Sequence, residues 1–293
     1  MLSEVRGLLE SNNNLEQKQK MKNRLAVCSW SLQATNAKEL VERIQQVGVK
    51  YVQLALSPVI NKPEAWKDLN VLFNKAGISV ISGMAETIGE DYSTLESIRV
   101  TGGIVPDVHW EGNWKHFQKI ADLAVSMNIK LITFHAGFIP HEPEKGEYQK
   151  LRERIIKIAG LFGEKGLILG LETGQERAEH LKSFLESLPV TNVRVNYDPA
   201  NILLYNNGDP IEVIDILAKH IEQCHLKDAT RTKVPGTWGA EVAVGTGEVN
   251  WPHFFEHLKK IGFKGDFSLE REAGNQRIAD LSAGRQLAEK LMH

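Results

Sequence analysis

The sequence predicts an α/β protein, a single-domain (β/α)8 TIM barrel behind a short N-terminal extension. Two observations predict it: short apolar segments alternate eight times with longer amphipathic ones, and no linker interrupts the alternation. Repeated alternation of this kind indicates parallel strands joined by right-handed crossovers, and eight units close a barrel. A doubly wound open sheet is the alternative, but no Gly-x-Gly-x-x-Gly motif follows the first expected strand.

The expected strands are short runs rich in apolar and β-branched residues. In chain order they are LAVCSW (25–30), YVQLAL (51–56), ISVISGM (78–84), KLITFHA (130–136), LILGLE (167–172), VRVNYD (193–198), IEQCHL (221–226) and DFSLE (266–270).

The expected helices lie between these strands, and their apolar residues recur at steps of three and four, as in Leu40, Ile44 and Val47. Glycines such as Gly48 and Gly262 fall where a helix should end. The helical segments are 36–48, 63–77, 113–128, 148–166, 176–188, 210–220, 250–262 and 275–291.

Residues 1–23 read as an N-terminal extension and residues 24–293 as the barrel domain. The first residues are polar and carry acids without a long apolar core, so they do not resemble a secretory signal. Their role is left open.

The composition excludes some partners. A net charge of −2 over 293 residues offers no basic field for nucleic acid, and no apolar run approaches the ~20 residues of a membrane span. Two cysteines, Cys28 and Cys224, each lie in an expected strand. Buried thiols suit a reducing compartment, so we expect a cytoplasmic protein with a small-molecule partner.

Titratable side chains end five successive strands: His135, Glu172, Asp198, His225 and Glu270. The carboxyl ends of barrel strands meet at one rim, where TIM barrels carry their function. Carboxylates on apolar strands are costly to bury without a cation. We therefore expect them to form one site.

Four of these residues predict a divalent metal site: Glu172, Asp198, His225 and Glu270. Three carboxylates and one imidazole suit manganese, magnesium or cobalt better than a closed structural zinc site. The prediction is one divalent ion, with manganese preferred and zinc not excluded.

The segment 226–251 is glycine-rich and contains Trp238, so we expect this loop to help form the substrate pocket. The histidines other than His135 and His225 lie in expected helices, connections or the tail. We interpret these as surface or packing residues, among them His141, His180 and His253.

From about Leu25 onward the chain resembles the xylose-isomerase-like barrel superfamily, and within it the sugar phosphate isomerase/epimerase proteins and ketose 3-epimerases. The resemblance rests on motifs that occur in order on the expected strands. They are Leu171-Glu172, Asp198-Pro-Ala-Asn201, His225-Leu-Lys-Asp228, Gly245-Thr-Gly247-Glu-Val-Asn-Trp251 and Ser268-Leu-Glu270.

In ketose 3-epimerases one metal is held by a Glu, an Asp, a His and a second Glu, which the resemblance carries to the four residues predicted above. It implies that Glu172 and Glu270 act as the two bases. Substrate contacts are expected from His135, Asn201, Arg231 and Trp238. The sequence departs from the family pattern at three places. Asn201 stands where the family has a histidine, Gln175 stands where it has an asparagine, and Asp228-Ala-Thr-Arg231 stands where it has Glu-x-Asn-Arg. These departures affect expected substrate contacts and leave the four metal ligands intact.

The resemblance implies a metal-dependent sugar isomerase or epimerase that abstracts a proton next to a carbonyl. The nearest alternative is a lyase or dehydratase acting on a keto-sugar or inosose from the same site. An abasic-site endonuclease on the same barrel would need more metal ligands and a basic groove. A sugar-binding barrel that has lost catalytic turnover is a third alternative, and the presence of all four expected ligands argues against it. The resemblance also suggests a homo-oligomer without fixing its size.

Overall fold

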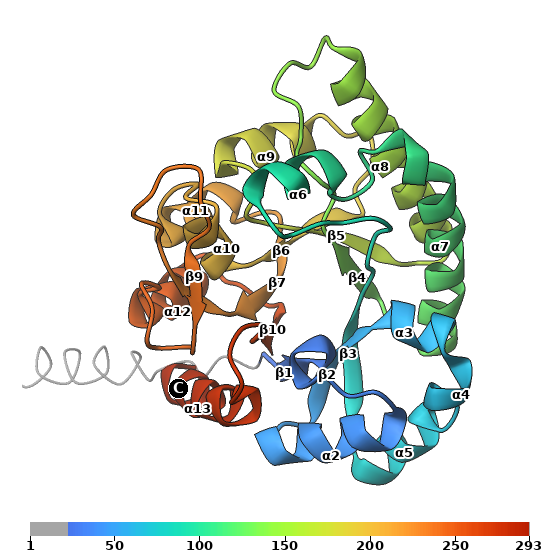
Figure 1. Ribbon diagram of the computed structural model, residues 1–293, viewed down its shortest axis with the longest axis vertical. Coiled ribbons are helices and arrows are strands. Elements are labelled where there is room, and N and C mark those ends of the chain that lie inside the picture. Colours follow the sequence, from blue (N-terminus) through green and yellow to red (C-terminus); the bar gives the residue numbers. More distant parts are fainter. Residues whose placement is uncertain (1–22, 293) are drawn as a thin grey trace, which may run out of the picture.

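Eight parallel strands close a barrel in the computed structural model, which describes residues 23–292. Around the barrel the strands follow the order β1-β10-β7-β6-β5-β4-β3-β2, and helices surround them (Figure 1). The eight strands are β1 (Leu25–Cys28), β2 (Tyr51–Ala55), β3 (Ser79–Met84), β4 (Leu131–Phe134), β5 (Ile168–Glu172), β6 (Val193–Tyr197), β7 (Ile221–Leu226) and β10 (Asp266–Leu269).

The helices follow the strands as the alternation predicts. The longer ones are α2 (Ala37–Val47), α5 (Leu69–Ala76), α7 (Asp107–Ser126), α8 (Gly146–Glu164), α9 (Ala178–Glu186), α11 (Pro210–Leu217), α12 (Trp251–Lys260) and α13 (Arg277–Leu291). Shorter ones are η1 (Ser29–Leu32), α3 (Leu56–Asn61), α4 (Pro63–Trp66), α6 (Leu95–Thr101) and α10 (Pro199–Leu204).

The TIM-barrel prediction is confirmed, with differences at the strand ends. The first strand stops at Cys28, and η1 takes up the residues expected to continue it. The expected loop after β7 contains an antiparallel hairpin, β8 (Asp228–Thr230) with β9 (Ala240–Val242). The extension predicted for 1–23 lies almost wholly outside the described residues, so its boundary stays a prediction.

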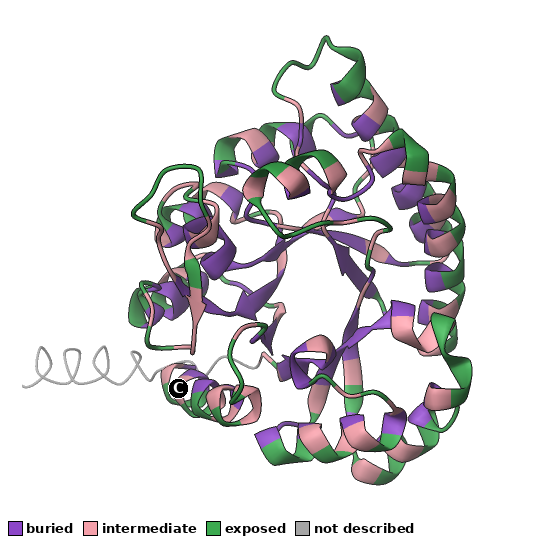
Figure 2. Cartoon of the chain, in the orientation of Figure 1, coloured by how far each residue is buried: buried purple, intermediate pink, exposed green. Residues whose placement is uncertain are grey.

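The apolar core lies between the barrel and its helices, and the strands are buried along nearly their whole length (Figure 2). Phe134 of β4 packs edge-on against Phe117 of α7 with ring centroids 5.1 Å apart, and Phe162 of α8 lies 6.2 Å from Phe117. Each ring removes a large apolar area from water, which fixes these helices on the strands.

The barrel interior is polar, in contrast to this outer layer. Gln53 of β2 donates its amide to Thr133 of β4 and accepts from Gln223 of β7, at 2.8 and 2.9 Å. These strands are not neighbours in the barrel, so the contacts cross its interior. Buried amides are retained at little cost when both their donors and acceptors find partners.

No helix within residues 23–292 is long and apolar enough to cross a membrane. In the same part of the chain Cys28 and Cys224 are both buried and unpaired, as the sequence predicts for thiols placed in strands.

Gly103 brings the connection between α6 and α7 against the end of β4. Its φ is +66°, and a Cβ there would lie 2.1 Å from the carbonyl carbon and oxygen of Ala136. The next residue, Ile104, donates its amide to that same oxygen at 3.1 Å. Only glycine allows both this backbone conformation and this approach.

We expect Gly103→Ala to lower the free energy of unfolding by more than Gly77→Ala. Gly77 has nearly the same φ, +65°, but open space around its Cβ position. The Gly77→Ala variant therefore measures the cost of the left-handed backbone conformation alone, about 1–2 kcal/mol. The difference between the two variants in urea unfolding then reports the steric clash. Equal losses would show that the contact with Ala136 is relaxed at no cost.

Candidate metal centre

Four side chains from successive strand ends converge at one end of the barrel. Glu172 ends β5, Asp198 follows β6 and caps α10, His225 lies in β7, and Glu270 follows β10. These strands are neighbours in the closed sheet, and one ligand atom from each residue lies within 4.8 Å of the others. The structure thus brings together all four residues of the predicted metal set.

The Nδ1 atom of His225 stands at the centre of the group. It lies 3.0 Å from Oε2 of Glu270, 3.5 Å from Oε1 of Glu172 and 3.6 Å from Oδ2 of Asp198. Within the described chain, His225 Nδ1, Asp198 Oδ2 and Glu270 Oε2 are buried without a hydrogen-bond partner. Three such polar atoms that face one another fit the ligand set of a cation.

Gln53 holds the other side of the His225 ring. The amide oxygen of Gln53 lies 2.8 Å from Nε2 of His225, and the amide nitrogen of Asn196 lies 3.0 Å from the same atom. In the tautomer whose Nε2 carries the proton, Gln53 accepts that proton and the free lone pair lies on Nδ1, the atom that faces the carboxylates. A lone pair turned toward three carboxylates is repelled unless a cation or proton lies between them.

The remaining carboxylate oxygens are held by neutral donors. Trp30 donates its indole N–H to Oε1 of Glu270 at 2.6 Å. The Asn201 side chain donates to Oε1 of Glu172 at 3.1 Å, and Asn196 donates to Oε2 at 3.2 Å. Asp198 accepts the amides of residues 200 and 201 through Oδ1, which leaves Oδ2 for the centre. These bonds orient the carboxylates without neutralising them.

The electrostatics of the group favour bound positive charge. Burial lowers the pKa of His225, but Glu270 and Glu172 outweigh it and raise that pKa well above its usual range. Burial raises the pKa of Glu172, but His135 and His225 lower it by more, so the pKa of Glu172 lies well below its ordinary value. The donor set therefore fits a divalent cation bound by carboxylates and one imidazole.

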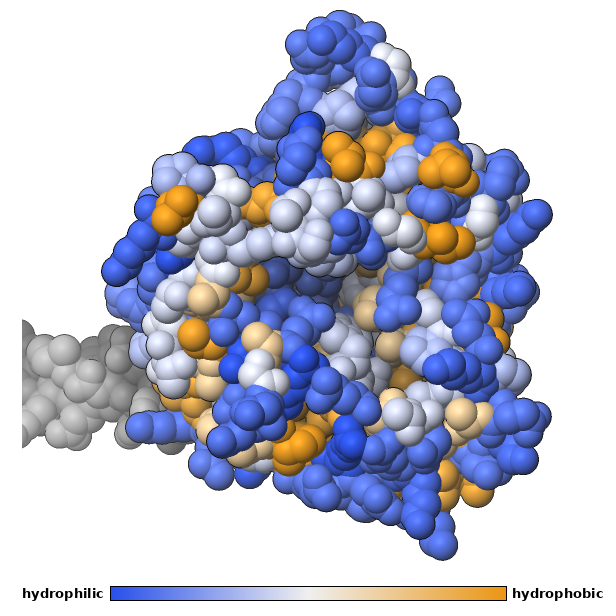
Figure 3. All heavy atoms as spheres, viewed as in Figure 1, coloured by the Kyte–Doolittle hydropathy of each residue, from blue (hydrophilic) through white to orange (hydrophobic). Residues whose placement is uncertain are grey.

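A cavity of about 590 Å³ opens above the four residues. Figure 3 shows a largely hydrophilic face that is hollowed near its centre. Three of the predicted substrate contacts, His135, Asn201 and Trp238, line this cavity. His135 also places Nε2 3.5 Å from Oε1 of Glu172, which connects the pocket wall to the cluster.

Arg231, the fourth predicted contact, is not among the residues that line the cavity. Its guanidinium donates to the Asn206 side chain at 3.0 Å and to the carbonyl of Gly208. It lies 3.8 Å from Glu248 as well. These contacts tie the end of β8 to the segment that follows α10 and hold the guanidinium of Arg231 among these partners.

Sequence reasoning missed Lys227, which lines the cavity and is 4% exposed. Its ammonium lies 2.8 Å from Glu272, 3.3 Å from Glu270 and 3.8 Å from Asp198. Burial lowers the pKa of Lys227, but these carboxylates outweigh it and raise that pKa well above the usual value. A strand places residues i and i+2 on one face, so the position of Lys227 two residues after His225 is the sequence signal that could have identified it.

Asp228 organises the loop that connects the hairpin β8–β9 to α12. Its carboxylate accepts the backbone amides of residues 229, 245, 247 and 249 at 2.8 to 3.2 Å. It also accepts the indole N–H of Trp251 at 2.9 Å. Gly247 is needed here because a Cβ would lie 2.2 Å from Oδ1 of Asp228.

A closed parallel barrel with a carboxylate and imidazole cluster at its strand ends defines a TIM-barrel protein with a candidate metal centre. The chain belongs to the xylose isomerase-like TIM barrel family, whose sequence model matches residues 29–291. The predicted resemblance to this superfamily is therefore confirmed.

Several known proteins are similar to this chain. A xylose isomerase domain protein from Planctomyces limnophilus is 31% identical, with a TM-score of 0.80 over 86% of this chain and 91% of that one. An uncharacterized Escherichia coli protein, YihM, is 28% identical over 103 residues, which span 34% of this chain and 31% of that relative.

More distant structures share the fold. One is an L-ribulose 3-epimerase, 15% identical, with a TM-score of 0.69 over 92% of this chain and 94% of that one. Another is the probable 3-DHS dehydratase AsbF from Bacillus anthracis, 16% identical, with a TM-score of 0.67 over 90% of this chain and 98% of that one.

We expect Asp228→Asn to loosen the loop 240–250 because an amide cannot accept all five hydrogen bonds. Each unsatisfied donor costs about 1–3 kcal/mol, so amide hydrogen exchange there should accelerate at least 10-fold. Asp209→Asn is the control, since that exposed carboxylate also accepts two backbone amides, at the start of α11. Unchanged exchange in 240–250 would show that the loop is held by other contacts.

Proposed function

We propose that the protein is a divalent-metal-dependent sugar isomerase or epimerase that abstracts a proton next to a carbonyl and proceeds through an enediolate. One observation carries the proposal. Three buried ligand atoms, on Asp198, His225 and Glu270, face one another without hydrogen-bond partners among the described residues, beside a cavity large enough for a sugar. Metal-assisted proton transfer is chemistry that this combination can perform.

The metal would be held by Glu172, Asp198, His225 and Glu270, with manganese preferred and magnesium, cobalt or zinc as alternatives. When bound, it supplies the positive charge that stabilises negative charge developing on the substrate carbonyl oxygen. Three carboxylates make the set richer in oxygen than zinc sites usually are, which supports the harder cations.

Glu172 and Glu270 are the candidate bases. They stand on β5 and after β10, with β6 and β7 between them in the barrel, so they approach the pocket from different sides. The indole of Trp30 fixes Glu270, and the amide of Asn201 fixes Glu172, which sets the direction in which each carboxylate can take or return a proton. Removal by one and return by the other inverts a carbon centre.

The cavity lining supports an uncharged polyol as substrate. Aromatic side chains of Trp30, Tyr92 and Trp238 offer flat faces to a sugar ring. Glu86, Glu90, Glu241 and Glu272 also line the cavity and can accept from hydroxyl groups, whereas Lys227 is the one lysine among the described lining residues. This excess of carboxylates would repel a phosphate group and the phosphate backbone of an abasic site.

A dehydratase acting on a keto-sugar or inosose is the second candidate. It needs the same proton abstraction followed by loss of a hydroxyl group. The similarity in fold to a probable dehydratase favours it, and His135, 3.5 Å from Glu172, stands where an acid could protonate the leaving hydroxyl.

We expect the wild-type protein to bind a divalent metal and to exchange a carbon-bound hydrogen of a ketose with solvent deuterium. Glu172→Gln should keep part of the metal but lose exchange by at least about 100-fold, because the base is gone. His225→Ala should lose both. Metal analysis and mass spectrometry of a ketose and keto-sugar panel measure the two quantities.

The control is Glu179→Gln, because Glu179 lies on the exposed face of α9. An isomerised or epimerised product supports the first candidate, and loss of water supports the second. Wild-type protein that binds no metal would overturn both, and metal binding without exchange on the panel would exclude proton abstraction from these substrates.

We expect Lys227→Met to change metal binding and turnover in opposite directions. Removal of the ammonium beside Glu270 and Asp198 leaves more negative charge for the cation, so metal affinity should rise. Turnover should fall by about 100-fold if the ammonium helps to stabilise the developing oxyanion. A fall in both would instead indicate that Lys227 only holds the carboxylates in place, and Lys227→Arg tests whether charge alone suffices.

A further inference from the structure

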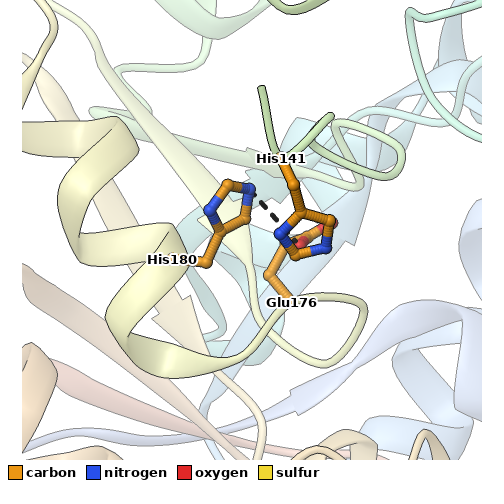
Figure 4. A group of neighbouring side chains, drawn as sticks. All are labelled: His141, Glu176 and His180. Atoms are coloured by element: carbon orange, nitrogen blue, oxygen red, sulfur yellow. Dashed lines mark ion pairs between the residues drawn. The ribbon is translucent and has the colours of Figure 1, made fainter. Parts of the chain in front are cut away.

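A second cluster of metal-binding side chains lies beside the candidate metal centre. It joins His141 of the β4–α8 connection, Glu176 of the β5–α9 connection and His180 in the first turn of α9 (Figure 4). One potential ligand atom from each lies within 4.8 Å of the other two. Within residues 23–292 only this group and the four-residue centre meet that criterion.

The cluster has a defined geometry. The rings of His141 and His180 stack at 30° with centroids 4.3 Å apart, and Oε2 of Glu176 lies 3.8 Å from Nε2 of His180. The other carboxylate oxygen, Oε1, accepts the amide of Ile139 at 2.6 Å. This bond fixes Glu176 so that Oε2 remains turned toward the imidazoles, as Figure 4 shows.

The cluster combines one buried acidic side chain with two imidazoles. Glu176 is 8% exposed, and in the described chain its one ion-pair partner is His180. The neutral imidazole is the form of histidine that binds metals.

We propose that His141, Glu176 and His180 form a second metal site for a borderline divalent cation such as zinc, separate from the four-residue centre. Two imidazoles and one carboxylate with an open position are a recurrent zinc ligand set. Donors of a tetrahedral zinc ion lie roughly 3.4 Å apart, so the ligands must draw together from their present limit of 4.8 Å. His141 is exposed on a loop and can make that movement.

The cation would replace the proton that Nε2 of His180 shares with the carbonyl of Ile139, 3.2 Å away. It would tie the β4–α8 connection to the start of α9. The first of these segments follows His135 and the second follows Glu172, and one small cavity is lined by both Glu172 and Glu176. The site would therefore act as a clamp on the two loops that follow His135 and Glu172, rather than as a second reaction centre.

The test measures zinc binding by the full chain after metal removal. The wild-type protein should bind two equivalents of zinc, and His141→Ala should lower the affinity for one of them by at least about 100-fold. Loss of a residue that only supports a metal ligand is expected to lower the affinity by roughly 10- to 100-fold. His180→Ala should behave alike. The control His253→Ala removes an exposed histidine of α12 and should bind as wild type does.

Cobalt provides a second readout, because four-coordinate cobalt absorbs visible light far more strongly than cobalt in an oxygen-rich six-coordinate site. The strong absorption should disappear in His141→Ala and persist in His225→Ala. Zinc should also slow hydrogen exchange in 136–145 of wild type but not of His141→Ala.

Unchanged zinc affinity and cobalt spectra in His141→Ala, which alters an exposed residue and should fold normally, would overturn the second site. That result is distinguishable from failure of the proposed function, because the four-residue centre is tested separately by His225→Ala and by deuterium exchange.

Discussion

The burial of three carboxylates at one end of the barrel is the constraint on which the site depends. Glu172, Asp198 and Glu270 are removed from water around His225, and each buried ion carries a desolvation cost of several kcal/mol. The strand ends supply no arginine to this group, and Lys227 approaches from one side only. A cation bound at this centre, as proposed, would offset that cost.

The polar interior of the barrel converts this constraint into a defined geometry. Gln53 contacts Nε2 of His225, and it is itself fixed by Thr133 and Gln223 from across the barrel. Trp30 and Asn201 aim the glutamates in the same way. Residues that support the ligands thus come from strands on all sides, so the closure of the sheet positions the site.

Loops with their own hydrogen-bond networks surround this centre. Asp228 gathers one loop through backbone amides, and the hairpin β8–β9 contributes Glu241 to the cavity wall. The second histidine cluster connects two other loops on the same side of the barrel. Both arrangements depend on residues far apart in the sequence, which explains why the pair His141 and His180 was not found by inspecting strand ends.

The sequence by itself determined the eight strands, most of the helices and the four residues of the candidate metal centre. It could do so because strand and helix periodicities are local, and because a parallel barrel brings all carboxyl ends of its strands to one rim. Only the tertiary structure decided that Arg231 turns away from the cavity, that Gln53 orients His225, and that His141 meets Glu176 and His180. These outcomes depend on loop paths and contacts across the barrel, which no local pattern encodes.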